Sequence, residues 1–227
     1  MIYIITGTSS GLGYQLTKKL LRKNKVIGVA RQEISKNKFS ENELKNYSHF
    51  KIDLSLEFSK IKPDILRLFD FIPDYEEFTL VMNAAKFTIS EEILNINESM
   101  DLYNCNFFNI TQIVKEATSI PNFRRVLFIN SISGLIAQSS QYDYSASKHA
   151  LQAFSDSLSL FAKEKKFDVM TINPGGMQTE LWNKVDNGPD TSDFLDPAEV
   201  SDIIASLLEL KGRFFIKKFV LLPPSDL

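Results

Sequence analysis

The feature that most constrains the fold is a regular alternation of short apolar runs with longer amphipathic segments. Seven runs have the length and composition of strands, at residues 2–6, 26–30, 49–53, 78–83, 125–131, 168–173 and 215–222. Between them, the spacing of apolar residues indicates helices at residues 12–22, 59–69, 99–118, 143–163 and 197–208. Strands that alternate with helices are typical of parallel sheets, because each parallel pair needs a long crossover. The sequence therefore predicts an α/β fold: a Rossmann-type, doubly wound parallel sheet of about seven strands with helices on both faces.

The chain is long enough for one large domain. It has 227 residues, of which 44% are hydrophobic, and no repeat or shift in composition marks a boundary. We therefore expect a single domain over residues 1–227. Two segments are polar and irregular. The segment at residues 31–47 is predicted to be a linker-like excursion, and residues 177–196 a lid over a substrate site.

Charge and cysteine content narrow the class of partner. The 26 basic and 28 acidic residues form no dominant block of one sign, so nothing indicates a nucleic-acid partner. The lone Cys105 excludes an internal disulfide, and no Cys/His cluster has the spacing of a zinc site. The first apolar run is too short for a signal peptide or a membrane span. We expect a cytoplasmic protein with no metal and no membrane partner.

A glycine-rich turn at residues 6–13 directly follows the first predicted strand and opens the first predicted helix. This is the context that a dinucleotide site requires. Gly7 permits a tight turn, Gly11 lets the backbone approach a pyrophosphate, and Gly13 lets the helix pack closely on the strand. Amide groups at the helix end then face the phosphates. The alternative, a loop of small residues that binds nothing, is disfavoured by this position.

The form of the nicotinamide cofactor depends on the residues after the second predicted strand. A basic residue there attracts the 2′-phosphate of NADP(H), whereas an acidic one binds the ribose diol of NAD(H). Arg31 stands at this point, which favours NADP(H). Glu33 lies near the spacing at which an acid selects NAD(H), so NAD(H) stays possible.

Tyr144 and Lys148 are four residues apart and share one face of a predicted helix. A free phenol has a pKa of about 10, and a neighbouring ammonium group is expected to lower it. Tyr144 could then act as a general acid or base. Ser131, at the end of a predicted strand, could hydrogen-bond a substrate carbonyl. Alternatively, Tyr144 packs in the core, Lys148 is a surface residue, or Ser133 takes the place of Ser131.

Taken together, these motifs resemble the short-chain dehydrogenase/reductase family. The resemblance spans roughly residues 1–180, in the order of the family's motifs, and rests on the glycine turn, Asp53, Asn83, Ala84, Asn104, Ser131, Tyr144, Lys148, Pro174, Gly175 and Thr179. It implies hydride transfer between a nicotinamide cofactor and a carbonyl or alcohol. It also implies that Lys148 binds the nicotinamide ribose and that an asparagine of the central helix supports a proton relay through water. Asn104 is predicted for this relay, with Asn106 as a close competitor.

The same resemblance implies which residues bind the cofactor: Thr6, Gly7, Ser9, Ser10, Gly11, Leu12, Gly13, Arg31, Asp53, Leu54, Asn83, Ala84, Ala85, Tyr144, Lys148, Pro174, Gly175 and Thr179. Asp53 is expected to close the adenine pocket, although a strand-end aspartate can also cap the next helix. Ala85 departs from the family's usual glycine and adds a methyl group where the backbone runs close to the cofactor. Lys86 adds a charge beside it.

Substrate contacts are expected from Ser131, Gln138, Gln141, Met177, Leu181 and Trp182, which suggest a mainly apolar pocket with a few amide contacts. The leading interpretation is an NADP(H)-dependent carbonyl reductase or alcohol dehydrogenase acting on a small, largely apolar substrate. Alternatives are an epimerase or dehydratase of the same fold and a non-catalytic sensor of the nucleotide. The resemblance also implies a homodimer or homotetramer that pairs the helices at residues 99–118 and 143–163.

Overall fold

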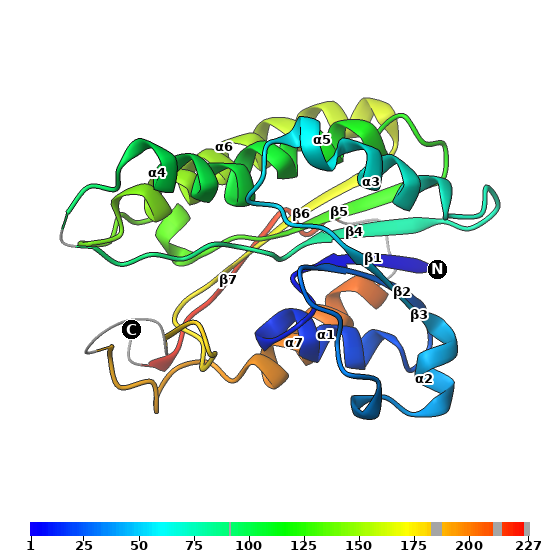
Figure 1. The fold of residues 1–227 in the computed structure, drawn as a ribbon, viewed down its shortest axis with the longest axis horizontal. Coiled ribbons are helices and arrows are strands. Elements are labelled where there is room, and N and C mark those ends of the chain that lie inside the picture. The colour runs from blue at the N-terminus through cyan, green and yellow to red at the C-terminus, as the bar shows by residue number, and fades with distance from the viewer. Residues whose placement is uncertain (91, 183–187, 211–214, 225–227) are drawn as a thin grey trace.

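The computed structural model of the chain describes residues 1–90, 92–182, 188–210 and 215–224. Its centre is one parallel sheet of seven strands in the order β3-β2-β1-β4-β5-β6-β7 (Figure 1). The strands are β1 Ile2–Thr6, β2 Lys25–Ala30, β3 Tyr47–Lys51, β4 Phe78–Met82, β5 Phe123–Ile129, β6 Asp168–Pro174 and β7 Lys218–Leu221. The predicted doubly wound α/β fold is confirmed.

Helices cover both faces of the sheet (Figure 1). They are α1 Gly11–Leu20, α2 Glu41–Asn46, α3 Phe58–Asp70, α4 Ile96–Tyr103, α5 Asn109–Ala117, α6 Tyr142–Lys165 and α7 Pro197–Glu209, with short turns η1 Lys36–Lys38, η2 Asn104–Phe108 and η3 Ile132–Gly134. Helices α1 and α7 lie on one face, and α3, α5 and α6 on the other. Because side chains alternate along a strand, Leu80 and Val81 of β4 join separate buried clusters, one on each face.

The strand order opens a crevice at the carboxyl ends of the central strands. β1 pairs with β2 on one side and with β4 on the other. The chain therefore adds β2 and β3 on one side of β1, then returns and adds β4 to β7 on the other side. In open α/β sheets, ligands bind at such a switch point. The glycine-rich turn after β1 lies at this end of the sheet.

Two predicted segments differ from the structure near the edge of the sheet. The strand predicted at residues 49–53 begins two residues earlier, at Tyr47, whose ring packs 4.9 Å from that of Phe39 between ring centroids. The segment at residues 31–47, predicted to be irregular, contains α2. This helix begins with a capping box in which Ser40 N–H donates to Glu43 Oε2 (2.7 Å) and Glu43 N–H donates to Ser40 Oγ (3.3 Å). The Ser-x-x-Glu pattern in the sequence was the signal for it.

The helix predicted at residues 99–118 is interrupted. It begins at Ile96 and contains the π-helical turn η2 between α4 and α5. In this turn the N–H of Asn109 donates to the carbonyl of Asn104, five residues back. A π turn shifts the face that later residues present, and such turns are frequent at functional sites.

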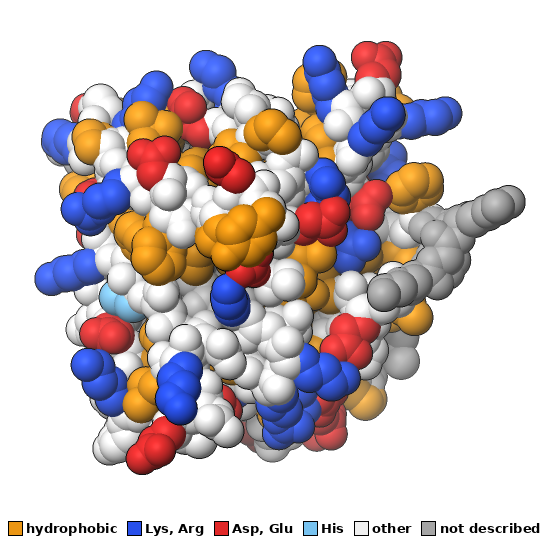
Figure 2. Space-filling view, turned by 90° about the vertical axis from the view of Figure 1, so that its right-hand side faces the viewer, with side chains coloured by type: hydrophobic (Ala, Val, Ile, Leu, Met, Phe, Trp, Pro, Cys, Tyr) orange, Lys and Arg blue, Asp and Glu red, His pale blue; other side chains and the backbone are white. Residues whose placement is uncertain are grey.

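The face at the amino ends of the strands carries charges of both signs around small hydrophobic groups (Figure 2). Lys25 pairs with Glu76, and Arg124 Nε lies 2.7 Å from Glu77 Oε1. Neither sign dominates this face among the described residues. Within the same residues, no helix combines the length and the apolar character needed to cross a membrane.

Candidate active site

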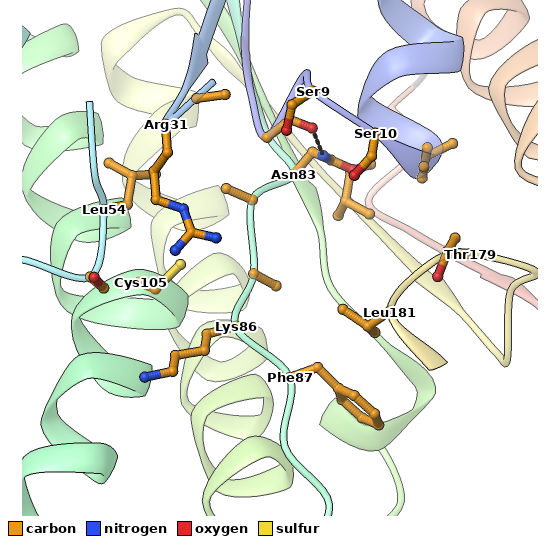
Figure 3. A pocket seen from close by; sticks show the side chains of 18 of the residues that line it. Ser9, Ser10, Arg31, Leu54, Asn83, Lys86, Phe87, Cys105, Thr179 and Leu181 are labelled. Carbon is orange, nitrogen blue, oxygen red and sulfur yellow. Dashed lines mark hydrogen bonds between the residues drawn. The ribbon is translucent and has the colours of Figure 1, made fainter. Parts of the chain in front are cut away.

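A cavity of about 560 Å³ opens at the carboxyl ends of the central strands (Figure 3). Most of the residues predicted to bind a cofactor line it: Gly7, Ser9, Ser10, Gly11, Leu12, Arg31, Asp53, Leu54, Asn83, Ala84, Ala85, Tyr144, Lys148 and Thr179. Of the predicted substrate residues, Met177 and Leu181 line it as well. The structure therefore brings together the glycine turn, the ends of four strands and the predicted catalytic helix around one space.

The glycine turn has the geometry that its sequence predicts. Gly7 and Gly11 have positive φ angles of 74° and 54°, which side chains rarely allow. A Cβ atom at Gly13 would lie 2.1 Å from the carbonyl oxygen of Gly7, so only glycine permits this close packing. The Ser10 side chain makes no cap on α1. The first N–H groups of α1 are therefore available to an anion in the cavity.

Several predicted residues support the cavity from outside its lining. Thr6 Oγ1 accepts hydrogen bonds from the N–H groups of Asn83 and Ala84, both at 2.9 Å. Asn83 Nδ2 in turn donates to the carbonyl of Thr6 (2.9 Å). These bonds join the end of β1 to the loop after β4. Among the other predicted residues, Gly13, Ser131, Asn104, Gln138, Gln141, Pro174, Gly175 and Trp182 also lie outside the lining.

Arg31 and Glu33 face different surroundings after β2. Arg31 lines the cavity beside Leu54 (Figure 3). Glu33 is not among the lining residues, and its charge acts on Tyr47 and His49 instead. Burial lowers the pKa of His49, and Glu33 opposes this change. The positive charge of Arg31 therefore faces the cavity, whereas the negative charge of Glu33 does not.

Asp53 holds the loop after β3. Its Oδ1 accepts hydrogen bonds from the N–H of Ser55 (3.0 Å) and from the Ser55 hydroxyl (2.8 Å). It does not cap α3, whose N-cap residue is Glu57. Asp53 lines the cavity, and the alternative of a helix cap is wrong.

Tyr144, Lys148 and Ser131 lie together. Both α6 side chains are buried, with Lys148 only 1% exposed. Lys148 Nζ lies 5.6 Å from the centre of the Tyr144 ring and donates to the carbonyl of Ile129 (3.3 Å). Ser131 shares a side-chain hydrogen bond with Tyr144. The alternative serine, Ser133, donates instead to Gln141 Oε1 (3.0 Å).

The protonation states of this cluster differ from the sequence prediction. Burial raises the pKa of Tyr144 to about 12, and the hydrogen bond with Ser131 only partly opposes this. The prediction of a lowered pKa for Tyr144 is wrong, because burial disfavours the charged phenolate. Burial also lowers the pKa of Lys148 to about 8. At neutral pH the phenol is therefore protonated and can donate a proton, while Lys148 keeps its charge.

The two candidate asparagines of the central helix contact different walls. Asn106 Nδ2 donates to the carbonyl of Lys86 (2.9 Å) and to Ser147 Oγ (3.1 Å), and its Oδ1 accepts from the Lys86 N–H (2.7 Å). Asn104 Nδ2 donates to the carbonyl of Ser55 (3.1 Å). Asn106 thus holds the wall next to α6, and Asn104 holds the loop after β3.

An aromatic wall lies next to Tyr144; the sequence predicted its Trp182 as a substrate residue but missed Phe87. Phe87 lines the cavity, and its ring lies 4.8 Å from that of Tyr144, edge to face. Trp182 lies 5.2 Å from Phe87 and 5.3 Å from Phe194. No periodic pattern marks Phe87, which follows the Asn-Ala-Ala motif in an extended loop. Its signal was a large aromatic residue two positions after Ala85.

The predicted lid is described in part, since residues 183–187 lie outside the described residues. Its two ends meet: Gln178 N–H donates to the carbonyl of Leu195 (2.9 Å). Trp182 Nε1 donates to the carbonyl of Met177 (2.9 Å), which fixes the indole against the first of these ends.

Two further residue types bear on the chemistry of the cavity. Cys105 lines it, and burial raises the pKa of its thiol to about 11, so the thiol is protonated at neutral pH. Within the described ranges, His, Cys, Asp and Glu side chains form no group of three that could hold a metal ion.

Comparisons with known proteins place the chain in a family. The short chain dehydrogenase family matches residues 1–190. A 3-amino-tetrahydro-pyrrolizinone reductase of Xenorhabdus hominickii is 32% identical over 226 residues, which cover 96% of this chain and 72% of the relative. A dehydrogenase/reductase SDR family protein 7-like protein of Drosophila melanogaster is 28% identical over 198 residues, and the match covers 79% of this chain but only 58% of the relative.

A solved structure supports the fold. The closed form of a serine dehydrogenase complexed with NADP+ aligns with a TM-score of 0.80 and 18% sequence identity, over 100% of this chain and 96% of that chain. The match of the family to residues 1–190 covers most of the sequence, and the Xenorhabdus relative aligns over nearly the whole of it. The chain therefore belongs to the short-chain dehydrogenase family, whose members are NAD(P)-dependent oxidoreductases.

Proposed function

We propose that this protein is an NADP(H)-dependent oxidoreductase that reduces the carbonyl group of a small, largely apolar substrate, or oxidises the corresponding alcohol. The observation that carries this proposal is the buried cluster of Ser131, Tyr144 and Lys148 next to the cavity that the glycine turn lines. A single domain is sufficient for this reaction, because the cavity and the cluster belong to one sheet.

When bound, the reduced nicotinamide supplies the hydride. Tyr144 donates the proton to the carbonyl oxygen, since its high pKa keeps the phenol protonated at neutral pH. Ser131 hydrogen-bonds the same oxygen and orients the carbonyl carbon. The charge of Lys148, 5.6 Å from the ring, stabilises the phenolate that remains after proton transfer. The reverse sequence oxidises an alcohol.

The position of Arg31 supports NADP(H) over NAD(H). Arg31 lines the cavity after β2, where a cation can bind the 2′-phosphate, and Glu33 does not line it. Without Glu33 in the cavity, an acidic side chain that would select the ribose diol is lacking at this point of the lining.

The lining near Tyr144 supports an apolar substrate. Phe87, Met177 and Leu181 line the cavity, and Trp182 packs behind Phe87. Such a wall contacts a flat or alicyclic ring through dispersion and apolar burial. We infer that residues 177–182 and 188–196, the described parts of the predicted lid, cover this end of the site.

The contacts of the central helix support Asn106 as the relay asparagine instead of Asn104. Asn106 is fully buried and hydrogen-bonds Ser147, which is adjacent to Lys148 on α6. Asn104 binds the loop after β3. The relay to Lys148 therefore depends on Asn106 in this proposal.

A panel of ketones and aldehydes tests the proposal by following the absorbance of NADPH in the presence of the protein. Net oxidation of NADPH with small aromatic or alicyclic ketones is the expected result. Product formed without net oxidation would instead indicate an epimerase or dehydratase. Binding of NADPH with no turnover across the whole panel would indicate a sensor and contradict the proposal.

A further inference from the structure

Two asparagines of the interrupted helix donate hydrogen bonds to backbone carbonyl groups of the loop between β3 and α3. Asn109 Nδ2 donates to the carbonyl of Leu54 (2.8 Å) and to the carbonyl of Leu56 (2.7 Å). Asn104 Nδ2 donates to the carbonyl of Ser55, between them (3.1 Å). Three consecutive carbonyl groups of this loop are thus held from one helix.

The π turn is what lets both asparagines reach the same loop. They are five residues apart, so in a regular α-helix their side chains would point about 140° away from each other. In the structure, the N–H of Asn109 donates to the carbonyl of Asn104 across the π turn. A wider turn returns the fifth residue toward the face of the first. The interruption therefore aligns two amide donors with one loop.

The contacts of Asn109 are maintained at an energetic cost. Its side chain is 0% exposed, and both hydrogens of Nδ2 are used on carbonyl groups. Its Oδ1 has no hydrogen-bond partner among the described residues. A buried acceptor without a partner destabilises the folded state. Turning the amide over would not help, because its oxygen would then face two carbonyl oxygens. This arrangement favours a role for the two donors beyond packing.

The loop that accepts these hydrogen bonds forms one wall of the cavity. Asp53, Leu54 and Ser55 all line it, and Leu54 lies beside Arg31 (Figure 3). Asp53 is joined to Ser55 by two further hydrogen bonds. The position of this wall therefore depends on the hydrogen bonds from Asn104 and Asn109.

We propose that Asn104 and Asn109 are positioning residues that fix residues 53–56 and thereby set the affinity for the nicotinamide cofactor without contacting it. The inference rests on the proposed function only in taking the cavity as the cofactor site. It does not depend on the substrate, on turnover or on the preference for NADPH over NADH.

A matched pair of variants separates this role from a loss of stability. Asn109→Ala removes the two hydrogen bonds to the carbonyl groups of Leu54 and Leu56. Asn122→Ala is the control: Asn122 is also buried and also donates to two backbone carbonyls, those of Pro73 (3.2 Å) and Glu76, but it lies at the amino end of β5. For each variant, fluorescence titration gives the Kd for NADPH and for NADH, and thermal unfolding gives the Tm without cofactor.

Both variants are expected to lower the Tm, but only Asn109→Ala raises the Kd, by about tenfold for each cofactor, because it loses two hydrogen bonds to the cofactor wall. The ratio of the two Kd values is expected to stay the same, since Arg31 is untouched. Asn109→Ala binding as tightly as the unchanged protein, or Asn122→Ala binding as weakly as Asn109→Ala, would overturn the inference. If Asn109→Ala does not fold, Asn104→Ala takes its place, with an expected rise of about threefold. Because titration needs no turnover, a protein that reduces no carbonyl still gives a clear answer.

Discussion

Among the individual side chains of the site, burial shifts the pKa values of the two that the proposed proton transfer depends on. Tyr144 and Lys148 face the same desolvated space, and burial moves their pKa values in opposite directions, to about 12 and about 8. In both cases the neutral form is favoured. A charged lysine that is 1% exposed therefore destabilises the fold.

Lys148→Met is expected to stabilise the fold while it destroys function. The pKa of Lys148 falls from 10.5 to about 8 in the folded protein. At pH 7 this corresponds to a penalty of up to about 3 kcal/mol, which a buried methionine does not incur. Thermal unfolding should show a higher Tm for the variant, and turnover with NADPH should fall by about 100-fold or more because the phenolate loses its counter-charge.

The stability of Lys148→Met relative to the unchanged protein is expected to depend on pH. Because the folded pKa is the lower one, the unfolded chain binds the proton more tightly between pH 8 and 10.5. The penalty is therefore fully present below pH 8 and disappears as the pH rises to 10.5. The difference in unfolding free energy between Lys148→Met and the unchanged protein should shrink over this range. A constant difference would mean that burial of the charge is not its cause.

Arg31→Asp is expected to reverse the cofactor preference. The substitution removes the cation that lines the cavity after β2 and adds a group that can bind the ribose diol. KM for NADPH should rise by about tenfold or more, while KM for NADH should not rise. Glu33→Gln is the control, since Glu33 does not line the cavity, and should leave both constants nearly unchanged. An undiminished preference for NADPH in Arg31→Asp would reject Arg31 as its origin.

At the residue scale, the sequence predicted which side chains lie together. It did not predict the direction of the pKa shift of Tyr144 or distinguish Asn104 from Asn106. Ser131, Tyr144 and Lys148 were identified because their types and spacing fit one reaction, and they do lie together. The pKa of Tyr144 was predicted in the wrong direction, because sequence spacing does not reveal depth of burial. Asn104 and Asn106 could not be separated, since a π turn leaves no mark in the apolar periodicity.

At the scale of elements, a few specific contacts hold the described part of the predicted lid near Trp182. The Trp182 indole is fixed by its bond to Met177 and by the rings of Phe87 and Phe194. We expect Trp182→Ala to loosen the apolar wall and to raise KM for a small ketone by about tenfold. The Kd for NADPH should stay within about twofold, because the indole does not line the cofactor part of the cavity.

Steady-state kinetics with varied ketone, and titration with NADPH, measure the two effects of Trp182→Ala. Tyr75→Ala is a suitable control, since Tyr75 is 85% exposed and lies before β4, at the other end of the sheet. Equal KM values for Trp182→Ala and the control would show that the aromatic wall does not contact the substrate.

Elements of the sheet core were predictable and its edges less so. β1 and β4 are buried throughout, so their continuous apolar runs have clear limits. β3 is partly exposed along its length, and its pattern is too weak to fix where it begins. The helix α2 was missed because its residues are mostly polar, although its capping box was visible.

For the whole molecule, two neighbouring helices leave apolar side chains uncovered. Leu160 on α6 is 74% exposed, and Phe161 and Phe108 are partly exposed as well. Phe107 and Phe154, in the same two segments, pack against the buried core instead. We expect a homodimer that covers the exposed residues, and expect Leu160→Glu to produce a monomer, because it places charges in an apolar contact.

Light scattering at micromolar concentration measures this assembly. Leu66→Glu on α3 is the control, because Leu66 is an exposed leucine of a different helix, and it should leave the oligomer intact. A monomeric unchanged protein would remove the prediction.

The central claim is that Tyr144 donates the proton to a bound carbonyl, and Tyr144→Phe tests it most directly. The variant keeps the ring that packs at 4.8 Å from Phe87 and removes only the hydroxyl. With the most active ketone of the panel, the rate of NADPH oxidation should fall by about 10²–10⁴-fold, while the Kd for NADPH stays within about twofold. A Tyr144→Phe protein that still oxidises NADPH at nearly the original rate would contradict the account.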